Sequence, residues 1–353
     1  MSLRFLPIVS LILGSLLLAG CDLLADQTDQ YILRGNTMGT SYTIKALRAR
    51  GKIDKEALYN DIKATLDNAN DKLNNWTDDT EISRFNASPS TNWQDISPTF
   101  LEVLQEAQRI HAESNGRFDI TLSPLIDMWG FGPEDNETLP SKAEIDAALA
   151  NVGQDSLLEL RNDPPSLRKR RGAVSVNLGA IAKGYSADLI ARTLEKHGIT
   201  DYLVEIGGDL IARGVNDMGV PWRVGIEKPN EIGRAVQLVV SVTDMGLATS
   251  GDYRNFFLDE EGRRMSHIID PVTGRPVTHN LASVTVLAAD GMRADGLATA
   301  LLVLGEEEGR EMANRLNIPA YFITREEEGF ATSSSKAFDA LMAKQNKAAS
   351  KGD

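Results

Sequence analysis

A single cysteine, Cys21, sets the first limit on how this chain of 353 residues can fold. One thiol cannot form an intrachain disulfide, so a packed hydrophobic core must supply the stability. The cysteine lies close to the N-terminus, directly after an apolar stretch. The part of the chain from Cys21 to Asp353 is long enough for one large domain or two closely joined lobes.

The N-terminal segment has the features of a secretory signal. Arg4 is the only charge before the apolar stretch from Phe5 to Ala19, which is short for a bilayer crossing. The stretch ends in Leu18-Ala19-Gly20-Cys21, which resembles a bacterial lipoprotein cleavage box. We therefore expect residues 1–20 to be a signal peptide, Cys21 to be lipidated, and residues 21–30 to form a tether. The alternative is an uncleaved N-terminal anchor with an incidental cysteine.

The residue after the cysteine bears on localisation. Asp22 follows Cys21 directly. By resemblance to lipoprotein sorting in Gram-negative bacteria, an aspartate here favours retention at the inner membrane. We therefore expect a membrane-anchored protein whose body faces the periplasm.

The charge balance excludes one class of partner. The chain carries 37 basic and 50 acidic side chains, a formal net charge of −13. Such a chain repels nucleic-acid backbones, so we expect no nucleic-acid partner. A phosphate-bearing ligand would need a metal ion or local basic groups as compensation.

The order of predicted elements favours an α+β fold. Residues 31–44 alternate apolar and polar side chains around Gly35 and Gly39, which indicates paired strands. Asp54 as an N-cap and a Ser141–Glu144 capping box mark two helix starts. Helices are predicted over 54–73, 98–114, 141–149, 292–304, 306–316 and 336–344, and strands over 202–206, 222–226, 236–242 and 283–288. We expect largely antiparallel sheets flanked by helices, a domain over 31–342 and a flexible tail over 343–353.

Asp295 and Thr299 are candidate metal ligands. They lie four residues apart on a predicted helix, so both side chains project from one face. A carboxylate and a hydroxyl suit Mg²⁺, which prefers oxygen ligands. The alternative is that Thr299 bonds back to its own helix and Asp295 acts as an N-terminal dipole partner.

The segment Gly179 to Gly184 is a candidate anion site. It precedes an apolar-periodic helix that runs to His197, so its backbone N–H groups could face a phosphate, with Lys183 adding a positive charge. The Gly-Lys-Ser/Thr ending of a P-loop is absent, and no Gly-x-Gly-x-x-Gly is present. Standard dinucleotide-binding folds are therefore disfavoured.

His267 is the candidate general base. It is one of four histidines, and no pair has the spacing of zinc ligands. Imidazole titrates near neutral pH and can take a proton from an attacking hydroxyl. His111 and His197 lie late in predicted helices, where we interpret them as C-terminal dipole partners.

Three apolar side chains are candidates for contact with a planar ring. Trp76 and Phe118 could sandwich such a ring, and Met38 offers a polarisable contact. Taken singly, each is also typical of a hydrophobic core. Trp129 we assign to packing.

Several motifs taken together resemble the FAD:protein FMN transferases, the flavin transferase family formerly described as thiamine-biosynthesis lipoproteins. The resemblance covers nearly all of the chain after Cys21. It rests on ordered blocks: Met38–Thr40, Gly116–Asp119, Asn177–Gly184, Glu205–Asp209, Thr249–Gly251, His267–Gly274 and Asp295–Thr299. Agreement of several blocks in order is far more specific than any one of them.

The resemblance implies a site as well as a fold. The fold would be α+β with two joined lobes and FAD in the cleft between them. By position, the flavin site would comprise Met38, Trp76, Arg117, Phe118, Asp119, Asn177, Lys183 and Ile269. The Ala180 carbonyl, Asp295 and Thr299 would hold Mg²⁺ on the diphosphate, and His267 would assist the transfer. Asn177 departs from the family, in which many relatives carry Asp, so it lacks the negative charge.

The implied reaction is Mg²⁺-dependent transfer of FMN from FAD to a threonine hydroxyl of an acceptor protein, with release of AMP. By family analogy, the acceptors would be subunits of Na⁺-translocating NADH:quinone reductase or of the related electron-transfer complex. Two alternatives stay open: an FAD pyrophosphatase that uses water, and a non-enzymatic periplasmic flavin-binding lipoprotein.

Overall fold

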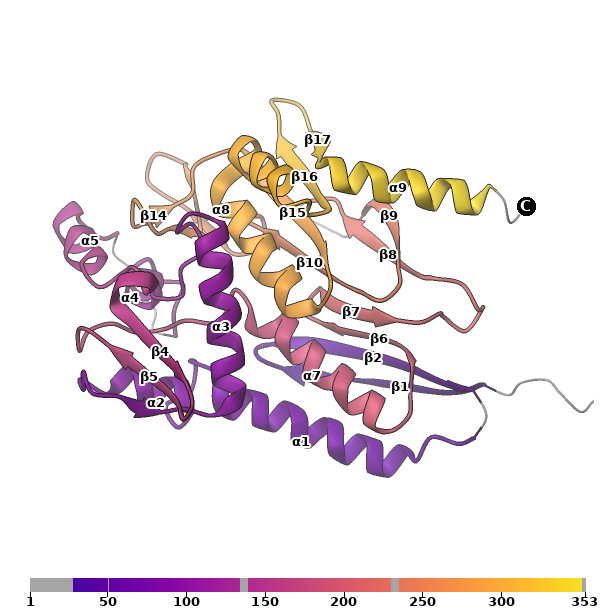
Figure 1. Cartoon of the computed structure of the whole chain (residues 1–353). Coiled ribbons are helices and arrows are strands. Elements are labelled where there is room, and N and C mark those ends of the chain that lie inside the picture. The colour runs from indigo at the N-terminus through magenta and orange to yellow at the C-terminus, as the bar shows by residue number, and fades with distance from the viewer. Residues whose placement is uncertain (1–27, 50, 134–138, 230–234, 351–353) are drawn as a thin grey trace, which may run out of the picture.

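An eight-stranded antiparallel sheet forms the centre of the protein (Figure 1). The computed structural model describes residues 28–49, 51–133, 139–229 and 235–350. The strand order is β1-β2-β6-β7-β10-β15-β16-β17, and every neighbouring pair in it is antiparallel. The strands are β1 (Thr28–Thr37), β2 (Thr40–Ala49), β6 (Asp201–Ile206), β7 (Asp209–Arg213), β10 (Met245–Gly251), β15 (Leu281–Ala288), β16 (Ala320–Arg325) and β17 (Phe330–Ser334). The predicted α+β class with antiparallel sheets is confirmed.

Different elements cover the two faces of this sheet. Helices α7 (Ala182–Lys196) and α8 (Gly291–Arg315) pack on one face, with α1 (Lys55–Leu73) and α3 (Pro98–Glu113) outside them (Figure 1). The hairpin of β8 (Trp222–Glu227) and β9 (Val236–Val242), together with α9 (Lys336–Ala349), covers the other face. There Trp222 and Phe338 share a hydrophobic cluster with Leu247 and Leu287 of the sheet. The centre of the sheet is therefore buried on both faces, whereas β1 keeps exposed side chains such as Ile32.

A smaller lobe is built mainly from the chain between β2 and α7. It contains α2 (Glu81–Ala87), α4 (Ser123–Met128), α5 (Lys142–Leu149), α6 (Gln154–Leu157), β3 (Gln94–Asp95), β4 (Leu158–Asn162) and β5 (Pro165–Lys169). Two short pairs, β11 (Phe256–Leu258) with β12 (Arg264–Ser266) and β13 (Ile269–Asp270) with β14 (Arg275–Pro276), follow β10. One hydrophobic cluster contains Phe85 and Phe100, from the chain between β2 and α7, together with Val284 and Phe322 of the large sheet. The two lobes therefore share a core.

Most predicted elements match those observed. Asp54 caps α1 by accepting the Ala57 N–H, and the Ser141–Glu144 capping box opens α5. The predicted helices 292–304 and 306–316 form the single element α8, interrupted at Gly305, which has a φ of +79°. One boundary was wrong: α9 continues to Ala349, so most of the tail expected from residue 343 is helical.

The predictions for the N-terminus fall on residues that the structure does not describe. Arg4, Cys21 and Asp22 lie outside the described part of the chain, so the signal, lipidation and sorting assignments stay predictions. Among the described helices, none combines the length and apolar character that a membrane crossing requires.

Close contact between α7 and α8 positions the start of α8. Gly184 and Gly291 face each other, and a Cβ built on Gly184 would lie 2.1 Å from the Gly291 carbonyl oxygen. The buried Asp188 carboxylate accepts the N–H groups of Gly291 and Met292 at 2.8 Å each. It therefore caps α8 from a neighbouring helix, because the first N–H groups of a helix have no partner within it.

We expect Gly184→Ala to destabilise the protein. Replacing a helical glycine by alanine ordinarily stabilises a helix by about 1 kcal/mol. Here the added methyl group would overlap a backbone carbonyl, and overpacking typically costs about 1–3 kcal/mol. Steric overlap should win, and urea unfolding should show a lower free energy of unfolding. An increase in stability would contradict the close contact.

Candidate functional site

A cavity of about 470 Å³ lies where the large sheet and the start of α8 meet the smaller lobe. Its lining comes from eight separate stretches of the chain, from Trp76 to Val303. Eleven of the twelve predicted flavin, metal and catalytic positions line it: Trp76, Arg117, Phe118, Asp119, Asn177, Ala180, Lys183, His267, Ile269, Asp295 and Thr299. The structure thus brings together residues that are far apart in the sequence.

Met38 is the predicted flavin contact that is not among the lining residues. It lies in the turn between β1 and β2 with a φ of +48°. Its sulfur accepts a hydrogen bond from the Ser186 hydroxyl of α7, at 3.4 Å. The methionine side chain therefore packs toward α7, and its contact with flavin stays a prediction.

Asp295 and Thr299 project from the first half of α8 into the cavity. Asp295 is buried, and its Oδ2 accepts the Gly184 N–H at 3.0 Å. The Thr299 hydroxyl lies 3.1 Å from the Ser250 hydroxyl of β10. Thr299 therefore contacts the sheet directly, and in the described part of the chain the partner of its hydroxyl is Ser250 and not its own helix.

The donor set suits a hard cation. Among the described residues, the Gly184 N–H and the Lys183 ammonium both donate to Oδ2 of Asp295. Oδ1 is therefore left for another partner. Ala180 lines the same cavity. In the described part of the chain, no cluster of three or more His, Cys, Asp or Glu side chains is arranged to hold a metal. The predicted set differs from such clusters because it combines one carboxylate, one hydroxyl and one main-chain carbonyl.

Lys183 lies between two buried carboxylates. Its ammonium is 2.9 Å from Oδ2 of Asp209 and 3.5 Å from Oδ2 of Asp295. Burial raises the pKa of Asp209 to about 7, and the nearby Asp295 charge adds to the rise, while Lys183 opposes it. The two carboxylates in turn raise the pKa of Lys183, against the effect of its burial. One fixed cation thus faces two carboxylates, so the cluster can accommodate further positive charge.

The start of α7 differs from the prediction for an anion site. The helix begins at Ala182, which places Lys183 and Gly184 in its first turn. The Gly179 N–H donates to Asn177 Oδ1, the Ala182 N–H to the Leu178 carbonyl, and the Gly184 N–H to Asp295. These three N–H groups already have protein oxygens as partners, so they are not free to bind a phosphate as the prediction assumed.

His267 has one ring nitrogen fixed by the backbone. Nδ1 lies 3.0 Å from the Asn255 carbonyl, so it must be the protonated nitrogen that donates. Nε2 is then the acceptor in the neutral ring. Burial lowers the pKa of His267, with a smaller contribution from the Lys183 charge, and the Asn255 carbonyl opposes the shift. The ring is therefore neutral near pH 7 and can accept a proton at Nε2.

Residues 117–119 join the cavity to the smaller lobe. Arg117 pairs with Asp270 at 3.1 Å, which ties this segment to the stretch that follows His267. The Asp119 carboxylate accepts the N–H groups of Thr121 and Gln154. Phe118 is buried, whereas Trp76 is 61% exposed, so the two aromatic residues predicted to contact flavin differ in their exposure to solvent.

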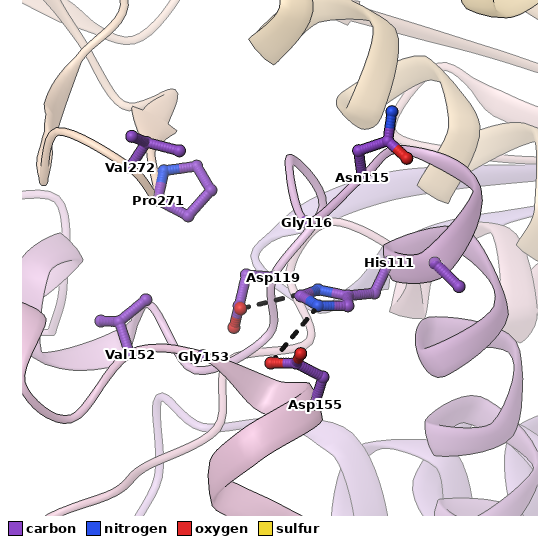
Figure 2. Close-up of a pocket in the computed structure, with 10 residues that line it drawn as sticks. His111, Asn115, Gly116, Asp119, Val152, Gly153, Asp155, Pro271 and Val272 are labelled. Carbon is purple, nitrogen blue, oxygen red and sulfur yellow. Dashed lines mark ion pairs between the residues drawn. The ribbon is translucent and has the colours of Figure 1, made fainter.

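A second cavity, of about 440 Å³, adjoins the first at Asp119 (Figure 2). Figure 2 shows the His111 ring between Asp119 and Asp155, with ring nitrogen to oxygen distances of 3.6 and 3.8 Å. His111 Nδ1 also lies 2.7 Å from the Phe118 carbonyl. As predicted, His111 lies in the last turn of its helix and His197 is the C-cap of α7.

Sequence reasoning missed three residues of the site. Asp209 and Ser250 lie within the blocks Glu205–Asp209 and Thr249–Gly251, so a signal for them was present. Asn255 acts through its backbone carbonyl. No side-chain pattern could have marked it, because any residue offers that group.

Comparison with known proteins agrees with this geometry. The model of the ApbE family matches residues 38–322. The chain belongs to the ApbE family. It is 42% identical to a protein of Vibrio cholerae named FAD:protein FMN transferase, across 93% of this chain and 97% of that protein. The corresponding Haemophilus influenzae protein is also 42% identical, across 93% and 95%.

Solved structures of the family share the fold. The flavin transferase ApbE of Vibrio cholerae superposes with a TM-score of 0.82 at 40% identity, covering 89% of this chain and 99% of that one. The apo flavinyl transferase ApbE of Pseudomonas stutzeri gives 0.82 at 40% identity, with 91% and 98% covered. The antiparallel sheet with its flanking helices is therefore the architecture of this family.

The Lys183–Asp209 pair should be energetically coupled. We expect a double-mutant cycle with Lys183→Met and Asp209→Asn to give a coupling free energy of about 1–3 kcal/mol, because the pair is largely shielded from water. The exposed pair Lys63–Asp67 is a matched control, at a shorter distance of 2.6 Å. Its coupling should be smaller, since solvent screens it. Equal coupling in both pairs, measured by urea unfolding, would contradict the role of burial.

Proposed function

We infer that this chain is an FAD:protein FMN transferase, which moves the FMN part of FAD onto an acceptor protein. One observation carries the inference: the cavity assembles eleven of the twelve family positions. The chain also matches named transferases over nearly its whole length, at 38–42% identity. We further propose that the acceptor group is a threonine hydroxyl.

The proposed step is a substitution at phosphorus. The threonine oxygen attacks the FMN-side phosphorus of FAD, and the bond from that phosphorus to the bridging oxygen of the diphosphate breaks. AMP leaves with the bridging oxygen, and FMN stays on the acceptor as a phosphoester. Holding both reactants in one shielded cavity supplies much of the rate enhancement in reactions of this type.

His267 is the proposed general base of this step. Its Nδ1 is held by the Asn255 carbonyl, so Nε2 is available to take the proton that the threonine hydroxyl loses. The Lys183 ammonium, held by Asp209, adds positive charge to the same cavity. Trp76 and Phe118 offer flat apolar surfaces for the isoalloxazine ring.

Mg²⁺ is the proposed metal. Asp295, Thr299 and the Ala180 carbonyl would hold it, and these three residues line one cavity with an Asp295 oxygen left for a further partner. When bound, the ion would neutralise charge on the diphosphate oxygens. Asp209 would help to orient the Asp295 carboxylate indirectly, because it holds the Lys183 ammonium that also contacts Asp295.

The proposed setting is the periplasmic face of the inner membrane. Leu18-Ala19-Gly20-Cys21 and Asp22 support a lipid anchor at Cys21 and retention at that membrane. The proposed acceptors are subunits of Na⁺-translocating NADH:quinone reductase or the related electron-transfer complex, which the membrane location would bring within reach.

Mass spectrometry of a co-expressed acceptor subunit tests the proposed function. We expect the subunit to gain one FMN on a threonine, with AMP released in equal amount. Rapid AMP release that is unaffected by the acceptor would instead identify an FAD pyrophosphatase. Tight FAD binding without any turnover would identify a flavin-binding lipoprotein.

Losing a residue that only supports a metal ligand typically costs roughly 10–100-fold in activity. Asp295→Asn should reduce the rate of transfer by more than this, because Asp295 is a proposed ligand itself. The amide keeps an acceptor for the Gly184 N–H, so the fold should persist. Asp209→Asn is the matched control, because Asp209 is also buried and touches Lys183 but is not a proposed ligand. Calorimetry should show that Mg²⁺ binding is lost in the first variant and retained in the second. Mg²⁺ binding that survives Asp295→Asn would remove Asp295 from the metal site.

His267→Ala should lower turnover by roughly 10²–10⁴-fold, the usual range for general acid–base catalysis. Because the pKa of His267 is lowered from 6.5, the base stays neutral through pH 7, and activity should fall only at pH values below 6.5. The variant should lack this acidic limb in a profile of kcat/KM against pH. His197→Ala is the control, since His197 pairs with Asp61 and is not a cavity residue. An unchanged profile in His267→Ala would exclude the assignment.

A further inference from the structure

The two edges of the β8–β9 hairpin differ. On β9, the Ser241 N–H donates to Gln345 Oε1 at 3.0 Å, and the Ser241 carbonyl accepts from Gln345 Nε2 at 2.8 Å. The side-chain amide of α9 thus pairs with this edge as another strand would. Both backbone groups of Ser241 must therefore point away from β8.

The orientation of Ser241 determines which groups of β8 face outward. Ser241 lies opposite Arg223, and Val239 lies opposite Gly225. In an antiparallel pair, residues directly opposite either bond to each other or both direct their backbone groups away. The N–H and carbonyl groups of Arg223 and Gly225 therefore point away from β9. Within the described residues, none forms a hydrogen bond with these four groups.

The open edge of β8 borders the catalytic cavity. Val224, Gly225 and Glu227 line the cavity that also contains His267 and Asp295. Gly225 is exposed and carries no side chain, and a Cβ there would lie 3.1 Å from a Val236 methyl carbon. A glycine inside a strand commonly marks a place where another backbone approaches closely. A strand added here would lie about 4.8 Å from β8, at the mouth of the cavity.

We propose that β8 is the docking edge for the acceptor protein, which adds an extended segment carrying the modified hydroxyl as a further strand. The proposal rests on the transferase function, because transfer requires the acceptor to meet this protein at the cavity, and the open edge is continuous with that meeting point. Main-chain bonds to Arg223 and Gly225 hold the segment, as in other complexes formed by strand addition. Since side chains alternate along a strand, every second residue of the segment can point into the cavity.

Proline substitution tests the edge. Arg223→Pro removes an outward N–H without breaking a bond to β9, whereas Arg223→Ala keeps that N–H and removes only the side chain. Val239→Pro is the matched control, because its N–H also points away from the partner strand but lies on the other edge. We expect Arg223→Pro to raise the KM for the acceptor subunit by about tenfold, because one bond is lost and the proline ring obstructs the added strand. Val239→Pro should stay within about twofold, since it leaves the main chain of this edge unaltered, and Arg223→Ala is the reference that separates loss of the side chain from loss of the N–H.

Thermal unfolding and FAD binding of each variant separate docking from folding. Equal KM values for Arg223→Pro and Val239→Pro in folded, FAD-binding proteins would overturn the proposal. If Arg223→Pro instead abolishes self-association without changing KM, the edge binds a second copy of this chain and the proposal is wrong. If the unaltered chain does not modify the unaltered acceptor, the transferase function itself fails.

A synthetic peptide spanning the acceptor threonine gives a second measurement that leaves the enzyme unchanged. N-methylation of one peptide residue at a time should weaken transfer at every second position, because only alternate N–H groups face β8. Equal tolerance at all positions would exclude strand addition.

Discussion

The contact between α7 and α8 is the constraint on which the site depends. Only glycine at 184 and 291 lets the two backbones approach this closely, because a Cβ on either residue would overlap the other backbone. The same contact brings the Gly184 N–H to the Asp295 carboxylate and places Asp188 under the first turn of α8. The position of the proposed metal ligand is therefore a consequence of helix packing.

Burial then determines the charge state of the site. Asp209 and Asp295 are both buried, and Lys183 is the cation between them. The low polarity of the surroundings raises the pKa of Asp209 and strengthens its attraction for Lys183. An acidic protein can thus still bind a diphosphate, because a lysine and the proposed Mg²⁺ supply positive charge where the ligand would lie.

Local patterns in the sequence predicted much of the fold. Asp54 and Ser141 marked helix starts correctly, since an N-cap acts on N–H groups only two or three residues away. Strand β7 was missed, because a central strand buried on both faces lacks a clear alternation. The end of α9 was placed too early, because a polar, charged segment gives no sign that its helix continues.

By itself, the sequence determined the residue types of the site and their family, since several ordered blocks specify these without coordinates. Only the tertiary structure decided which atoms meet: that Nε2 and not Nδ1 of His267 is available, that Asp209 holds Lys183, and that the open edge of β8 borders the cavity. The physical reason is that these contacts join residues distant in the chain. Their geometry follows from how helices and strands pack, and spacing along the sequence carries no record of it.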